Sequence, residues 1–296
     1  MAGVAVLIAG AVAGAIWYRS RPLSTAAIVK RLPTRDALVL YIDFDALRRA
    51  GVLKILDSSS AGEDADYRRF VEKTQFDYRR DLDSAVVSFA PTGKYMLVRG
   101  RFDWSSLHRY ARDQGGNCVN AFCRMQGSQP DRQISFFRLQ SGLMGLAVST
   151  DDYAARRLSE TPSGPDPEIP AEPVWLSVPA SLLRSGESLP PGTRMFARSI
   201  AQADSVVLAF APEGNRLAAR LDVRCRSDRD ASDIAGELSR ATAMLRDMIE
   251  REHQKPNPAD LSGVLTSGTF RSEGTRVIGH WPIEKSFIEN VLSGGA

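Results

Sequence analysis

Two stretches of twenty residues in this chain resemble each other, and this similarity limits what the chain can fold into. Residues 83–102 begin DSAVVSFAPTG and residues 204–223 begin DSVVLAFAPEG. Aligned without a gap, they are identical at Asp83/Asp204, Ser84/Ser205, Val86/Val207, Phe89/Phe210, Ala90/Ala211, Pro91/Pro212, Gly93/Gly214 and Arg99/Arg220. Each copy has an apolar strand, a Pro-x-Gly turn and a second strand, the pattern of a β-hairpin. The repeat predicts an internal duplication built around two equivalent hairpins.

The similarity extends beyond the hairpins when short gaps are allowed. ALVLYIDFDALRR at 37–49 parallels PVWLSVPASLLRS at 173–185, and each reads as an apolar strand that runs into an amphipathic helix. Each copy then predicts the order strand, helix, helix, hairpin, helix, hairpin, helix. The expected fold class is α+β, with two tandem copies of this unit and mainly antiparallel sheets after an N-terminal transmembrane or signal helix.

Proline marks the expected boundary between the copies. The segment ETPSGPDPEIPAEP contains five prolines among acidic and small residues, which cannot continue a helix or a central strand. We therefore expect a first α+β repeat at 28–159, a Pro-rich linker at 160–172 and a second repeat at 173–293, preceded by a membrane anchor or signal segment at 1–21.

The N-terminal segment AGVAVLIAGAVAGAIWY, residues 2–18, predicts contact with a membrane. It carries no charge and is followed by Arg19 and Arg21. A spanning helix needs about 20 apolar residues, so both a retained anchor and a cleaved signal peptide agree with this length. We expect a body outside the cytoplasm, periplasmic or on the cell surface. The basic residues that follow the segment leave a cytoplasmic body open under the positive-inside rule.

The cysteines bear on the compartment. Cys118 and Cys123 lie in GGNCVNAFCRMQGS, which reads as a Gly- and Asn-rich loop in which two thiols can approach each other. A disulfide between them would suit an oxidising compartment, whereas two reduced thiols or half of a metal site are the alternatives. Cys225 continues the inward alternation of RLAARLDVRCRS, so we assign it to the core.

The charge balance and the search for sequence motifs point to no particular chemistry. The 38 Lys+Arg against 35 Asp+Glu leave a net charge of +3 without a dense basic tract, so no nucleic-acid partner is expected. The chain has no nucleophile elbow, Walker loop, Rossmann fingerprint, H-E-x-x-H or C-x-x-C motif, and no cofactor or metal is predicted.

A few single residues remain as candidates. His108 follows Trp104 on a predicted helix, and His280 and Trp281 are neighbours at a strand end where they could line a pocket. Asp43 and Asp45 follow a strand directly, where an acid is expected to cap the next helix. The arginines 220, 224 and 226, with Arg99 and Arg101 on the matching strand, could face an anionic lipid or polymer, although such charges ordinarily solvate a sheet or pair with acids.

The opening of the first copy resembles a known group of sequences. It reads LP-x-x-D-ALVLYID-x-D-ALRR from Leu32 to Arg49, with FDYRRDLDS at 76–84 and RGRFDWSSL at 99–107. This is similar to bacterial envelope proteins of unknown function that begin LP-x-D-x-x-hydrophobic-x-D-x-D. The resemblance implies a membrane-tethered, non-catalytic α+β body, and it carries over no activity, substrate or catalytic residue.

Two functions follow as hypotheses. The first is a membrane-anchored, non-catalytic binding or scaffold module of the cell envelope, with a protein, lipid or glycan partner. The alternative is a divergent hydrolase with a site in the cleft between the repeats, built from residues such as His108 and His280 with nearby acids.

Overall fold

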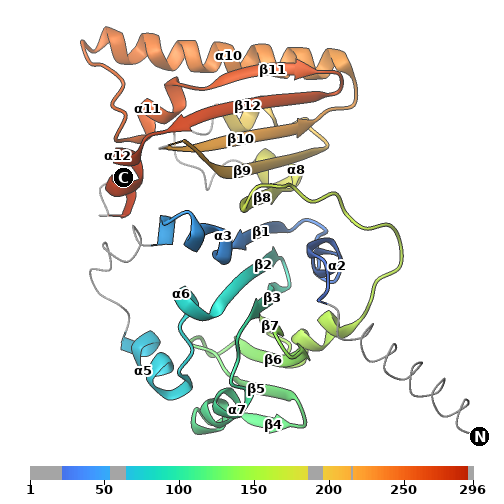
Figure 1. The fold of residues 1–296 in the computed structure, drawn as a ribbon. Helices are drawn as coiled ribbons and strands as arrows, with labels where there is room; N and C mark the ends of the chain where they lie inside the picture. The colour runs from blue at the N-terminus through green and yellow to red at the C-terminus, as the bar shows by residue number, and fades with distance from the viewer. Residues whose placement is uncertain (1–21, 54–64, 186–195, 215, 293–296) are drawn as a thin grey trace, which may run out of the picture.

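The structure, a computed structural model, describes residues 22–53, 65–185, 196–214 and 216–292. Their strands form one antiparallel sheet of twelve strands, in the order β11-β12-β10-β9-β8-β1-β2-β3-β7-β6-β5-β4 (Figure 1). The strands are β1 Leu38–Asp43, β2 Leu82–Ala90, β3 Gly93–Gly100, β4 Asn117–Val119, β5 Phe122–Gln126, β6 Gln133–Gln140, β7 Leu143–Ser149, β8 Val174–Val178, β9 Ser205–Glu213, β10 Arg216–Arg224, β11 Thr269–Glu273 and β12 Arg276–Ile283.

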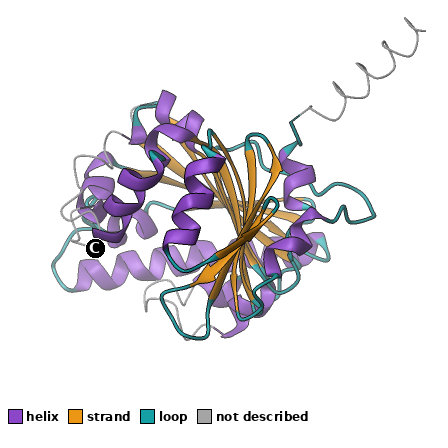
Figure 2. Cartoon of the chain, turned by 90° about the horizontal axis from the view of Figure 1, so that it is seen from below, coloured by secondary structure: helices purple, strands orange, loops and turns teal. Residues whose placement is uncertain are grey.

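Helices lie on both sides of this sheet (Figure 2). They are α2 Thr25–Val29, α3 Phe44–Arg49, α5 Ala65–Thr74, α6 Tyr78–Asp81, α7 Trp104–Asp113, the 3-10 helix η1 Ala154–Ser159, α8 Ala180–Ser185, α10 Asp228–Arg251, α11 Leu261–Thr266 and α12 Lys285–Leu292. Within the described part of the chain, no helix has the length and apolar character needed to cross a membrane. The predicted membrane segment at 2–18 lies outside the described residues.

The centre of the sheet corrects the predicted fold class. Strands β1 and β8 pair with each other, Val39 opposite Ser177 and Tyr41 opposite Trp175. The prediction of two tandem strand–helix units with sheets of their own is therefore wrong, because the strands of both segments share one sheet. An unpaired strand edge exposes backbone donors and acceptors, and the β1–β8 pairing satisfies those of both segments at once.

The repeated hairpins lie at corresponding places in this single sheet. Outward from the central pair, the order is β2, β3, β7, β6 on one side and β9, β10, β12, β11 on the other. Residues 83–102 fall mainly in β2–β3 and residues 204–223 in β9–β10, so each hairpin follows directly on a central strand. The strands β5 and β4 extend the first side alone, as a hairpin where the sequence predicts a loop.

The sheet has two faces with different cover. We call one the helix face; α10 packs on it over β11 and β12, and α7 packs on it near β4 and β5. Inward residues of α10 recur at three- and four-residue intervals, which gives one apolar stripe: Ala231, Ile234, Ala235, Leu238, Ala241 and Thr242. The alternation predicted for β10 is confirmed here, because Leu221, Val223 and Cys225 join this core.

We call the opposite side the strap face. A second core lies on it beneath α2 and η1, and includes Val39, Val86, Tyr95, Leu97 and Leu158. This core crosses the central strand pair, because Trp175 of β8 belongs to it and stacks on Tyr41 of β1 at 5.5 Å between ring centroids. The strands on either side of the β1–β8 pair therefore share side-chain packing as well as backbone hydrogen bonds.

A cap fixes where β1 ends. The side chain of Asp43 accepts a hydrogen bond of 2.8 Å from the backbone N–H of Ala46 and so caps α3. Asp45 follows in the first turn and pairs with Arg48 at 3.1 Å. The predicted capping role is confirmed for Asp43, whereas Asp45 lies within the first turn of the helix.

Candidate functional site

The Pro-rich segment 160–172 does not hold two bodies apart; it runs along the strap face from η1 to β8 (Figure 1). We call it the strap. Basic residues at the end of α2 hold its first part: Arg31 donates to the backbone oxygens of Ser159 at 3.0 Å and Glu160 at 2.8 Å, and Lys30 contacts Asp166 at 3.2 Å. These contacts join the segment before β1 to the segment before β8.

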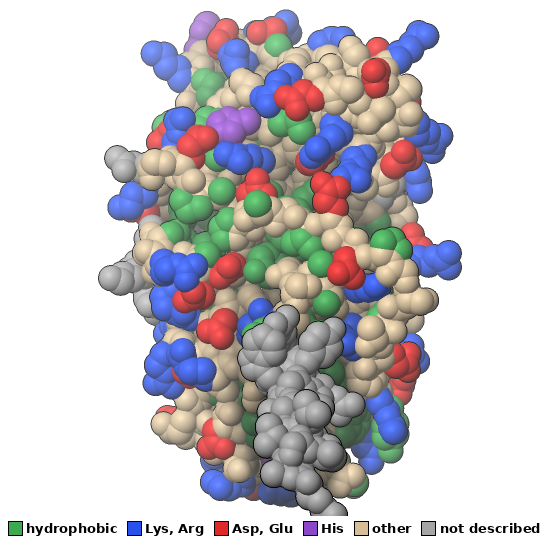
Figure 3. Space-filling model, turned by 45° about the vertical axis from the view of Figure 1, so that its right-hand side comes forward, with side chains coloured by type: hydrophobic (Ala, Val, Ile, Leu, Met, Phe, Trp, Pro, Cys, Tyr) green, Lys and Arg blue, Asp and Glu red, His purple; other side chains and the backbone are tan. Residues whose placement is uncertain are grey.

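The second part of the strap covers arginines of β10 and β12. Glu172 lies 3.4 Å from the Arg220 guanidinium, and Glu168 pairs with Arg224. On the neighbouring strand, Arg276 pairs with Asp222, whose hydrogen bond and charge raise the pKa of Arg276. A hollow of about 470 Å³ lies between the strap and strands β9, β10 and β12. We call it the arginine groove. On this side of the molecule, basic and acidic side chains are interleaved (Figure 3).

The geometry of the groove follows from strand periodicity. Arg220 and Arg224 are four residues apart on β10, so they lie on one face about 13 Å apart. Glu168 and Glu172 are also four residues apart, and a Pro-rich chain of about 3.1 Å per residue separates them by about 12 Å. Because Glu172 meets Arg220 and Glu168 meets Arg224, the strap runs antiparallel to β10 with its acids in register with the arginines.

The arginines that the sequence analysis grouped together have different surroundings in the structure. Arg220 and Arg224 line the groove, whereas Arg226 pairs with Asp204 at 3.3 Å. Arg99 donates to the backbone oxygen of Leu23, and Arg101 to that of Arg80. Sequence reasoning missed Arg276 although it lies directly opposite Arg224 in the sheet, because the pairing of β10 with β12 is needed to see it.

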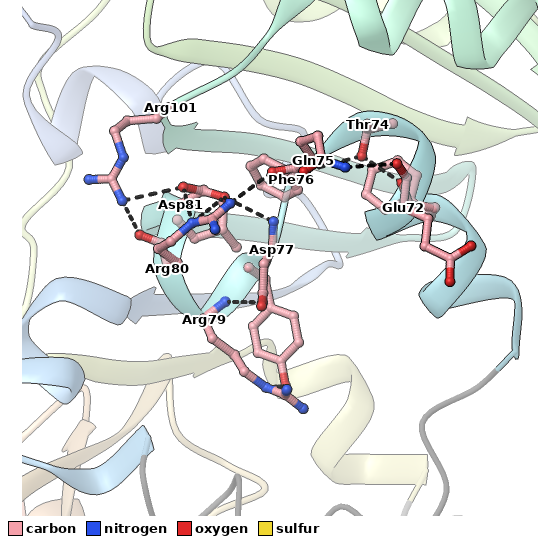
Figure 4. Close-up of polar contacts among 12 residues, drawn as sticks. Glu72, Thr74, Gln75, Phe76, Asp77, Arg79, Arg80, Asp81 and Arg101 are labelled. Atoms are coloured by element: carbon pink, nitrogen blue, oxygen red, sulfur yellow. Dashed lines mark hydrogen bonds and ion pairs between the residues drawn. The ribbon is translucent and has the colours of Figure 1, made fainter.

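A second charged cluster surrounds Asp81 at the start of β2 (Figure 4). Its carboxylate accepts hydrogen bonds from the Arg80 guanidinium at 2.8 Å and from the backbone N–H of Asp77 at 3.0 Å, and Arg101 lies 3.4 Å away. These hydrogen bonds and charges lower the pKa of Asp81 to about 2. A Cβ on Gly100 would overlap the backbone oxygen of Asp81, so the strand passes too close for a side chain there. The cluster joins α6 to the end of β3 and serves stability.

Cys118 and Cys123 face each other across the β4–β5 hairpin and are joined by a disulfide, with their Cα atoms 4.1 Å apart. Asn120 at the tip has a φ of 55°, a left-handed conformation that Asn tolerates better than most residues. Cys225 carries a free thiol in the core beneath α10. Among the described residues, no group of three or more His, Cys, Asp or Glu side chains could hold a metal ion.

The histidine candidates lie far apart in the fold. His108 is on α7, which packs near β4 and β5 at one end of the sheet, and His280 is on β12, near the other end. Burial, together with Arg112 and Arg138, lowers the pKa of His108, and its Nε2 atom has no hydrogen-bond partner among the described residues. His280 Nε2 lies 3.2 Å from Oε1 of Glu213, the last residue of β9. The two histidines expected in the hydrolase alternative therefore do not share a site.

His280 and Trp281 do not line one pocket either. Neighbouring residues of a strand point to opposite faces. His280 lies opposite Arg220 in the sheet and reaches Glu213, whereas Trp281 packs edge-to-face on Phe270 at 5.1 Å within the core under α10. Trp281 is a core residue.

The comparisons with known proteins bear on the fold and not on the function. The sequence matches no protein-family model and no curated protein. Among solved structures, crystal form III of TP0453 superposes with a TM-score of 0.52 at 9% identity, over 93% of this chain and 99% of that chain. Crystal form I of TP0453 gives a TM-score of 0.51 at 13% identity, over 92% of this chain and 99% of that chain. The chain therefore shares the overall fold of TP0453.

Proposed function

We propose that this protein is a membrane-tethered, non-catalytic binding module of the cell envelope, and that the arginine groove takes an extended acidic segment of a partner protein. The observation that carries the proposal is the seating of the strap. Two carboxylates spaced four residues apart lie on two arginines with the same spacing. The groove is thus shaped for a chain of the pattern acid-x-x-x-acid, and the strap is its built-in occupant.

The strap is also weakly enough held to be displaced. The side chains of Arg220 and Arg224 are about half exposed, and ion pairs between exposed groups contribute roughly 0–1 kcal/mol each. A tethered segment still competes at an effective concentration in the millimolar range. A partner must therefore offer more contacts than the strap, and neutralising the strap should open the groove.

The tether and the compartment belong to the same proposal. The uncharged segment at 2–18 supplies the membrane contact, and the disulfide between Cys118 and Cys123 suits a body that lies outside the cytoplasm. Membrane fractionation of cells carrying the full chain, beside a chain that starts at residue 22, tests this part. Recovery of both chains in the soluble fraction would remove the tether from the proposal.

The binding experiment uses the sequence of the strap as a probe. We expect the peptide PDPEIPAEP to bind weakly or not at all to the full chain, because the strap occupies the groove. The doubly substituted chain Glu168→Gln, Glu172→Gln should bind it at least about tenfold more tightly, as measured by fluorescence anisotropy at low salt. Adding Arg220→Gln and Arg224→Gln to that chain should abolish the gain.

Two controls decide the result. The first control adds Arg229→Gln to the Glu168→Gln, Glu172→Gln chain in place of the groove substitutions. It removes an exposed arginine of α10 far from the groove and should leave binding unchanged. A peptide with both glutamates replaced by glutamine should not bind. Equal binding of the peptide before and after the strap substitutions would contradict the groove as its site.

A further inference from the structure

A second hollow, distinct from the arginine groove, lies at the far end of the sheet. It has a volume of about 410 Å³ and is bounded by the β4–β5 hairpin and by η1 with the turn before it. The hairpin contributes Asn117, Asn120, Phe122 and Arg124, while Tyr153 and Arg156 come from the other side. Nothing in the proposed function uses these residues.

An aromatic platform forms one wall of this hollow. The ring of Tyr153 stacks on that of Phe122, with centroids 5.7 Å apart and planes inclined by 8°. The Arg124 guanidinium lies 4.5 Å from the centre of the Tyr153 ring and is held by Asp152 at 2.5 Å. Phe122 and Arg124 are two residues apart on β5 and both contact Tyr153, which still remains 45% exposed. A tyrosine ring held by these contacts and open to solvent offers an aromatic surface on which a ligand can pack.

The remaining lining is mixed, because Val119, Ala121 and Phe137 are apolar whereas the asparagines and arginines are polar or charged. Asn117 and Asn120 are exposed and offer amide groups that both donate and accept hydrogen bonds. Asp152 neutralises Arg124, whereas the Arg156 guanidinium has no ion-pair partner among the residues that the structure describes. The hollow therefore presents one uncompensated positive charge, suited to bind a carboxylate through two parallel hydrogen bonds.

We infer that this hollow is a binding site for an acidic carbohydrate, in which a sugar ring packs on Tyr153 and a sugar carboxylate pairs with Arg156. A pyranose ring has a flat face of C–H groups that matches an aromatic ring, and hydroxyl groups at its edge that match planar amides. The open, partly polar lining fits such a ligand better than a lipid chain, which needs an enclosed apolar cavity. The disulfide holds the hairpin that carries Asn117, Phe122 and Arg124.

The test uses two trisaccharides with the full chain in detergent. We expect trigalacturonic acid to bind, measured by isothermal titration calorimetry, and neutral maltotriose to bind at least about tenfold more weakly because it lacks the carboxylates. Tyr153→Ala and Arg156→Gln should each weaken binding of trigalacturonic acid by about tenfold or more. Arg157→Gln is the matched control, because Arg157 is the next residue, pairs with Asp151 at 3.2 Å and does not line the hollow.

Each other outcome overturns the inference. Equal binding of both trisaccharides would remove the role of Arg156, and unchanged binding by Tyr153→Ala would remove the platform. An absence of binding by either sugar, with the native circular dichroism spectrum retained, would show that the hollow is not a carbohydrate site. Because Arg220→Gln and Arg224→Gln should leave sugar binding unchanged, failure here and failure of the arginine groove are distinguishable.

Discussion

At the scale of single residues, the sharpest electrostatic feature is the environment of Asp81. Asp81 is only 7% exposed. Its carboxylate accepts hydrogen bonds from three donors: the side chains of Arg80 and Arg101 and the backbone N–H of Asp77. The hydrogen bond from Arg80 contributes most to the lowered pKa, and burial opposes it. The ionised carboxylate is therefore favoured in the folded state, which links the stability of the protein to pH.

Replacement of Asp81 by Asn tests this linkage. Lowering the pKa from 3.8 to about 2 corresponds to about 2 kcal/mol of stability, which is present above the unfolded pKa and is lost as pH falls from about 4 through about 2. Urea unfolding at pH 7 should show Asp81→Asn to be less stable by about that amount, and the difference should shrink toward zero near pH 2. Asp131→Asn is the control, since that side chain is 68% exposed. A difference that stays constant between pH 7 and pH 2 would contradict the account.

At the scale of elements, the β4–β5 hairpin depends on its covalent link more than other parts of the sheet do. Strand β4 has three residues and pairs with β5 alone, so few backbone hydrogen bonds hold it. Closing a ring as short as that between Cys118 and Cys123 stabilises a fold by no more than about 3 kcal/mol. The value of the bond is local, because it keeps the edge of the sheet and the hollow beside it in place.

Thiol labelling tests the hairpin and the compartment together. Native protein from its own membranes, alkylated without reductant, should carry no label on Cys118 or Cys123. Cys225 should react after denaturation, because it is buried and burial, with Asp230 and Asp204, raises the pKa of its thiol. A Cys225→Ser chain then reports on the pair alone. If native protein takes up label at Cys118 and Cys123 at once, the body lies in a reducing compartment and the proposed location is wrong.

Elements also show what the sequence could and could not predict. The hairpins at 83–102 and 204–223, the cap at Asp43 and the alternation of β10 all depend on residues close in the chain, and local spacing was enough to find them. The sequence predicts a loop in place of the β4–β5 hairpin, because Gly115 and Gly116 precede this segment and it contains Asn117 and Asn120. The pairing of the strap with β10 joins residues 48 and 56 positions apart, and no local pattern specifies such a contact.

At the scale of the whole molecule, the pairing of β1 with β8 makes the two sides one body. The duplicated hairpins predict two separate sheets, since each repeat has its own amphipathic helices. Yet Trp175, at 3% exposure, packs in the core beneath α2 together with Tyr41, and Ala209 of β9 belongs to the same core. Cutting between the sides would expose both this packing and the edges of two central strands.

The chain should therefore unfold as one unit although its sequence is repetitive. Calorimetry of residues 22–296 should show a single transition, because strands and core residues of both sides depend on the β1–β8 contact. The separate chains 22–172 and 173–296 should each lack a cooperative transition, since β1 loses Trp175 and β8 loses Tyr41. Mixed during refolding, they should form a one-to-one complex that unfolds cooperatively, which size-exclusion chromatography with calorimetry would detect. Cooperative unfolding of chain 22–172 alone, at the urea midpoint of the intact protein, would show instead that the first side is an independent domain and that the central pairing adds little to its stability.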